Sequence, residues 1–149
     1  MKRLIPLLLL GALAACTAEQ PAPPKFDAVD ACTLLASGDA GNLKGTAKAD
    51  RACDFTFDSL TARVTLLTST YEDASKPLQA DGGYGAVIGD RPMTRRCADA
   101  SGEVTCDAVV EVRAGQLIGL KVVQRSHDPN ALGQVTQGLA AKALERLPK

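Results

Sequence analysis

Five cysteines are the residues of this chain whose chemistry is easiest to interpret: Cys16, Cys32, Cys53, Cys97 and Cys106. Cys16 stands apart because it ends an apolar leader, whereas the other four lie in polar and mixed sequence. Four cysteines in an exported chain are typical of two disulfides. A zinc site is the alternative, but no two of them have the close spacing of a zinc knuckle, and the chain's single histidine is remote in sequence.

Three pairings of these four cysteines are open. The sequential pairing, Cys32 with Cys53 and Cys97 with Cys106, closes the shortest loops, and each bridge would then contribute roughly 3 kcal/mol. Residues 98–102 have the composition of a turn, which would place Cys97 opposite Cys106 across a hairpin.

The N-terminus has the three parts of an export signal. Lys2 and Arg3 precede the apolar residues 4–13, and small residues lead to Cys16. This run is too short for a transmembrane helix, which needs about 20 apolar residues. Leu13-Ala14-Ala15-Cys16 matches the lipobox, where a cysteine receives a diacylglyceryl group. We therefore predict a signal peptide over 1–15, with lipid on Cys16; the alternative is an ordinary signal peptide with an incidental thiol.

A basic cluster next to a glycine-rich segment is the first candidate binding site. Arg91, Arg95 and Arg96 could hold a phosphate or a carboxylate, and Tyr84 could border the pocket. The alternative is a set of surface charges beside a disulfide, with a flexible connector before it.

Ser126-His127-Asp128 contains the residue types of a hydrolase triad. Consecutive residues do not normally form that relay, which depends on groups brought together from distant positions. A turn that caps the following helix is the favoured interpretation, so we assign no catalytic residue.

Two pairs of carboxylates lie on the polar faces of expected strands: Asp54 with Asp58, and Asp107 with Glu111. Such pairs could act on a sugar or bind calcium. The solvated face of an antiparallel sheet has the same pattern, and we predict neither a metal site nor a cofactor.

The elements that must position these residues follow from hydrophobic periodicity. Residues 17–25 are proline-rich and predict an extended tether over 16–26. Alternation of apolar and polar residues predicts strands. The expected elements are a short helix capped by Asp27 or Asp30 and ending near Leu35, a loop over 37–50, strands over 53–57, 61–70 and 93–97, a short helix over 76–80, an extended piece over 84–88, and a hairpin of 103–113 with 116–124.

A final helix begins at Asp128-Pro129, where Asp128 or Ser126 caps it and proline occupies the first turn. Its apolar residues recur every three or four positions through Leu147, so one face must be covered. We predict a single α+β domain over 27–149: an antiparallel sheet of four to five strands packed against N- and C-terminal helices, with two disulfides.

Two cysteine-centred motifs resemble a known family. Asp30-Ala31-Cys32-Thr33-Leu34-Leu35, followed after a polar loop by Cys53-Asp54-Phe55, is similar to an actinobacterial lipoprotein family, domain of unknown function 3558. The chain departs from that family at Phe55, where tryptophan is frequent, and at Ala31, where proline is frequent. The resemblance implies a Cys32–Cys53 bridge and an anchor in the outer leaflet of a plasma membrane, but no activity.

Charge and anchoring together limit the classes of function that the chain can have. The chain has 17 basic and 17 acidic residues, which gives no electrostatic case for nucleic acid. We expect the protein to lie on the extracytoplasmic face of the cell membrane. We predict a non-enzymatic domain that binds an envelope protein or a small ligand. The alternatives are an envelope hydrolase of a glycan or ester, and a structural accessory lipoprotein of a membrane complex.

Overall fold

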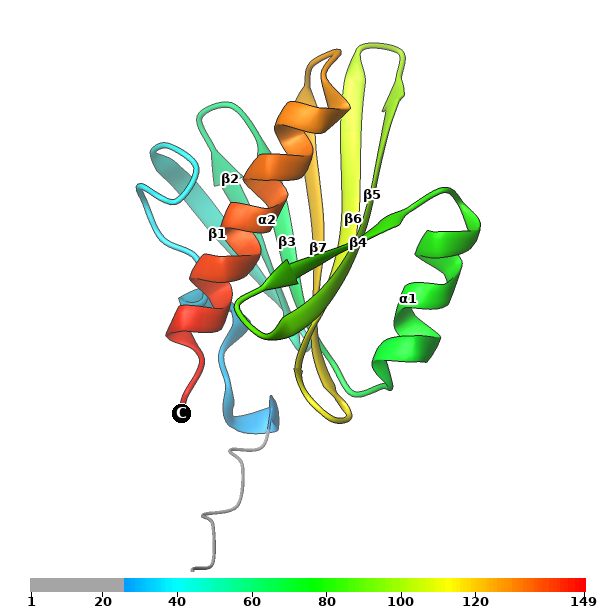
Figure 1. The fold of residues 1–149 in the computed structure, drawn as a ribbon. Coiled ribbons are helices and arrows are strands. Elements are labelled where there is room, and N and C mark those ends of the chain that lie inside the picture. Colours follow the sequence, from blue (N-terminus) through cyan, green and yellow to red (C-terminus); the bar gives the residue numbers. More distant parts are fainter. Residues whose placement is uncertain (1–25) are drawn as a thin grey trace, which may run out of the picture.

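The computed structural model describes residues 26–149, which form one antiparallel sheet with a helix on each face (Figure 1). The predicted signal peptide, Cys16 and residues 17–25 of the tether lie outside the described residues. The elements are two short 3-10 helices, seven strands and two α-helices: η1 (Phe26–Ala28), η2 (Ala31–Thr33), β1 (Leu43–Ala49), β2 (Ala52–Phe57), β3 (Thr61–Leu67), α1 (Tyr71–Ala80), β4 (Tyr84–Ile88), β5 (Arg91–Ala100), β6 (Glu103–Arg113), β7 (Gln116–Arg125) and α2 (Pro129–Arg146).

The α+β class and the antiparallel sheet are confirmed, but four to five strands is too few. The described residues form seven strands in the order β1-β2-β3-β7-β6-β5-β4. The prediction of a loop over 37–50 is wrong at β1, an edge strand whose residues are mostly exposed and lack alternation. Pairing with β2, rather than burial, defines this strand. The predicted hairpin is present as β6 and β7, and Gly115 in its turn has a φ of 77°.

Helix α2 packs on the inner face of the curled sheet (Figure 1). Asp128 caps it, since its carboxylate accepts hydrogen bonds from the amides of Asn130 and Ala131. The helix buries a stripe of apolar and small residues against alternate positions of the strands. The fully buried members include Leu132, Leu139, Ala140 and Ala143 on α2, with Val64, Val110, Ile118 and Val122 on the sheet.

Helix α1 packs on the opposite, outer face. The alternation of β5 establishes this, because Thr94 is hydrogen-bonded to Tyr71 of α1 while Arg95 donates to Gly133 of α2. The helix begins at Tyr71, five residues before the predicted start, because Thr70 caps it by accepting from the Asp73 amide at 3.1 Å.

Both bridges of the sequential pairing are present, Cys32–Cys53 and Cys97–Cys106. Cys97 and Cys106 lie directly opposite each other on β5 and β6, as the predicted hairpin requires. The predicted N-terminal helix is instead two short 3-10 helices, because the Leu34 amide bonds back to Ala31 and closes the second one. Within residues 26–149, no helix combines the length and apolar character that crossing a membrane requires.

Candidate functional site

The three arginines of the predicted anion site point in different directions. Arg95 is only 5% exposed, and its guanidinium donates to the carbonyl of Gly133 and, at 3.1 Å, to the side chain of Gln137. The ring of Tyr84 covers it, with the guanidinium carbon 5.1 Å from the ring centroid. Arg95 therefore joins β5 and β4 to α2, and the N–H groups of its guanidinium face the interior.

Arg91 and Arg96 make other structural contacts. Arg91 donates to the carbonyl of Val112 at 2.5 Å, and Arg96 donates to the carbonyl of Asp81 at 3.0 Å, just beyond the end of α1. Because neighbouring strand residues face opposite sides, Arg96 lies on the outer face and Arg95 on the inner one. The structure thus brings Tyr84 and Arg95 together and leaves the other two arginines apart.

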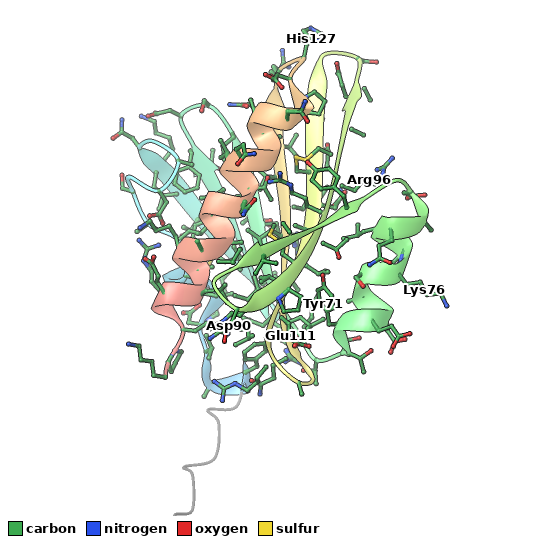
Figure 2. All side chains as sticks on the ribbon, in the orientation of Figure 1. Tyr71, Lys76, Asp90, Arg96, Glu111 and His127 are labelled. Carbon is green, nitrogen blue, oxygen red and sulfur yellow. A yellow bond between two sulfur atoms is a disulfide. The ribbon has the colours of Figure 1, made fainter. Side chains whose placement is uncertain are left out.

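Ser126-His127-Asp128 forms the turn that leads into α2. The Ser126 hydroxyl accepts from the Asp128 amide at 3.1 Å, and the Asp128 carboxylate caps the helix. The His127 imidazole lies at the tip of the molecule (Figure 2) and is 81% exposed. It contacts Asp99 at 3.2 Å instead of either neighbour. The three side chains do not form a relay.

The carboxylates of the predicted strand faces are dispersed over the surface. Asp54 pairs with Arg63 at 3.3 Å, and Asp58 pairs with Lys44 at 2.7 Å. The hydrogen bond from Lys44 is the main reason that the pKa of Asp58 is below its ordinary value. Across residues 26–149, no three His, Cys, Asp or Glu side chains are grouped as a metal site would require.

The outer face has a groove that sequence reasoning did not identify. It lies between α1 and strands β3, β7 and β6 and has a volume of about 290 Å³. Most of its lining is aliphatic, and two charged residues, Asp107 and Lys121, are among its polar members. The lining residues are Thr65, Leu67, Ala74, Pro77, Leu78, Asp107, Ala108, Val109, Gly119, Leu120 and Lys121.

Gly119 keeps this groove open. It lies in the middle of β7, opposite Thr65 of β3 and Val109 of β6. A Cβ atom at this position would lie 3.1 Å from Cδ1 of Leu67, so any larger residue would occupy the groove. An isolated glycine inside a strand often indicates such a close approach, and this was the available sequence signal.

Helix α1 covers the outer face through a partly polar contact. The hydroxyl of Tyr71 is hydrogen-bonded to Thr94 at 2.7 Å, and Ser75 is 3% exposed. Figure 2 shows Tyr71 directed toward the sheet and Lys76 directed away from it. Pro77 lies inside α1, where proline removes one backbone hydrogen bond. One wall of the groove is therefore a helix that is held to the sheet partly through polar side chains.

A row of charged residues crosses the outer face beside the groove. The strand registers place Arg63 opposite Asp54 and Lys121, and Asp107 opposite Lys121 and Arg96. Neighbouring strands are about 4.8 Å apart, so Arg63 and Lys121 are adjacent like charges. We refer to Asp54, Arg63, Lys121, Asp107 and Arg96 as the charged row.

Comparison of the chain with models of known protein families, with curated proteins and with solved structures gave no match.

Proposed function

We propose that the protein is a lipid-anchored domain on the extracytoplasmic face of the cell membrane that binds its ligand or partner on the outer face of the sheet, without catalysis. The observation that carries the binding site is the open groove beneath α1. An aliphatic depression with a few polar groups at its edge is the usual form of a binding site.

Anchoring is supported by the leader, by the lipobox ending at Cys16 and by the two disulfides. Disulfides persist in oxidising compartments outside the cytoplasm. Binding rather than hydrolysis is supported by the dispersal of the carboxylates Asp54 and Asp58, each paired with a cation on the surface. It is also supported by the turn at residues 126–128, where the His127 imidazole contacts Asp99 and the Asp128 carboxylate caps α2. We also propose the relationship to domain of unknown function 3558.

Mass spectrometry of the protein from its native membranes tests the anchor. We expect the mature chain to begin at an acylated Cys16, with the other four cysteines oxidised. An unacylated residue 16, or free thiols at the other positions, would contradict this part of the proposal.

Photo-crosslinking in the native cells tests the binding face. A photoreactive residue in place of Lys121, at the edge of the groove, should yield specific adducts. The matched control replaces Lys142, an exposed lysine on α2. Adducts from position 121 but not from 142 support the proposal; equal yields, or none from 121, oppose it.

A further inference from the structure

The chemistry of the groove indicates what it binds. Building on the proposed function, we infer that the ligand is an anionic amphiphile, with an aliphatic chain along Gly119 and a carboxylate head beside Lys121.

The first step is the shape and composition of the groove. Leu67 of β3, Leu78 of α1 and Val109 of β6 line it, and no aromatic side chain is among the lining residues. Its volume of about 290 Å³ gives room for a short alkyl chain, and burial of methylene groups favours binding.

The second step is the charge at the edge of the groove. The charged row contains three cations and two carboxylates, so its net charge is positive. Asp54 pairs with Arg63, and Asp107 lies opposite both Lys121 and Arg96, so two carboxylates serve three cations. Lys121 also lies opposite the like charge of Arg63, which is unfavourable. An anionic head at Lys121 would balance the third cation and reduce this repulsion.

The third step distinguishes a small amphiphile from a peptide. Strands β3, β7 and β6 are interior strands, so their backbone groups are already paired within the sheet. A peptide backbone in the groove would find few partners for its own N–H and C=O groups, and unpaired polar groups are costly to bury. An alkyl chain has no such groups.

A photoreactive probe tests the inference on the mature lipoprotein in nanodiscs of zwitterionic lipid. A decanoate that carries a diazirine should label peptides of α1 or β7, and unlabelled decanoate should compete. A decylammonium probe of equal length should label these peptides about threefold less, because it meets the net positive row. Equal labelling by both probes would overturn the charge assignment.

Two variants fill the groove from opposite walls. Gly119→Val acts from β7 and Ala74→Leu acts from α1, and each should reduce groove labelling about tenfold because the chain is displaced. The matched control is Gly138→Ala on α2, where an added Cβ meets nothing within 4 Å; its labelling should not change. Circular dichroism checks that each variant folds. Unchanged labelling in a folded Gly119→Val or Ala74→Leu protein would overturn the inference.

The amphiphile inference and the proposed function can fail independently of each other. If position 121 crosslinks a polypeptide in cells while decanoate does not label the groove, the outer face binds a protein and the amphiphile inference fails alone. If neither experiment yields a product at the groove, both fail.

Discussion

Helices α1 and α2 cover opposite faces of the same strands, and they differ in how their contacts are made. Helix α2 buries Leu132, Leu139 and Ala143 completely in the inner core. Helix α1 contacts the outer face through a tyrosine hydroxyl, a buried serine and a leucine that lines the groove. Closely packed apolar contacts support stability, while a less filled face leaves space for a ligand. The inner face therefore supports stability, and the outer face has the space that the proposed binding requires.

The largest difference in stability between the two faces should come from truncating one leucine side chain on each face. Leu139→Ala removes a fully buried side chain from α2 and should lower the free energy of unfolding by about 4 kcal/mol. Leu67→Ala, at the half-buried groove wall, should cost about 1 kcal/mol. Urea unfolding measures both losses. Equal losses would show that the two faces are packed alike.

The disulfides should stabilise the inner face and leave the groove intact. Cys53 and Cys106 are both fully buried in the inner core. The bridged cysteines are 21 and 9 residues apart in sequence, so replacing each pair by alanine should cost about 3.3 and about 2.6 kcal/mol. Chemical denaturation gives the stability, and decanoate labelling of the folded fraction gives the binding. Loss of labelling without loss of stability would reverse the assignment.

The end of α2 is held to the N-terminal segment by an ion pair. Arg146 forms a bidentate contact with Asp39 and also donates to the carbonyl of Leu34 at 3.0 Å. The hydrogen bond from Arg146 is the main reason that the pKa of Asp39 lies below its ordinary value of 3.8. Because the folded pKa is depressed, this stabilisation is present above pH 3.8 and is lost as the pH falls through the folded value.

Arg146→Met should therefore lower the free energy of unfolding by about 2 kcal/mol at pH 7. The difference from the wild-type protein should shrink in acid, as Asp39 becomes protonated. Unfolding curves at pH 7 and at about pH 3 provide the comparison. A difference that does not change with pH would contradict the role of Asp39.

The smallest effect should be on α1. Tyr71→Phe removes the partner of the buried Thr94 hydroxyl and should cost about 1 kcal/mol. Tyr84→Phe is the matched control, because its half-exposed ring remains over Arg95. Thermal unfolding of both variants measures the difference. An equal effect at Tyr84 would show that α1 does not depend on this hydrogen bond.

Elements with strong local signals were predictable from sequence. Residues that alternate in polarity defined β2, β3 and the hairpin of β6 and β7, and Asp128-Pro129 defined the start of α2. Strand β1 was missed because its residues are exposed and it depends on a partner strand. The predicted helix over 76–80 missed the first five residues of α1, although Thr70 and Asp73 have the spacing of a cap.

The candidate site was harder to predict, because register and layer assignment are properties of the whole sheet. The like charges Arg63 and Lys121 are far apart in sequence and become neighbours only when β3 pairs with β7. The groove further requires α1 to lie across the outer face. By contrast, the separation of Arg95 from Arg96 follows from strand alternation alone, so it could have been recognised once that strand was assigned.

Hydrogen exchange of the mature protein tests the division between the faces most directly. The comparison is between the protein in its native membranes, where we propose that it meets its ligand, and the protein purified into nanodiscs. The account predicts slower exchange in native membranes for amides of residues 71–80 on α1, with no change for residues 129–146 on α2. Protection confined to α2, or equal in both helices, would contradict it.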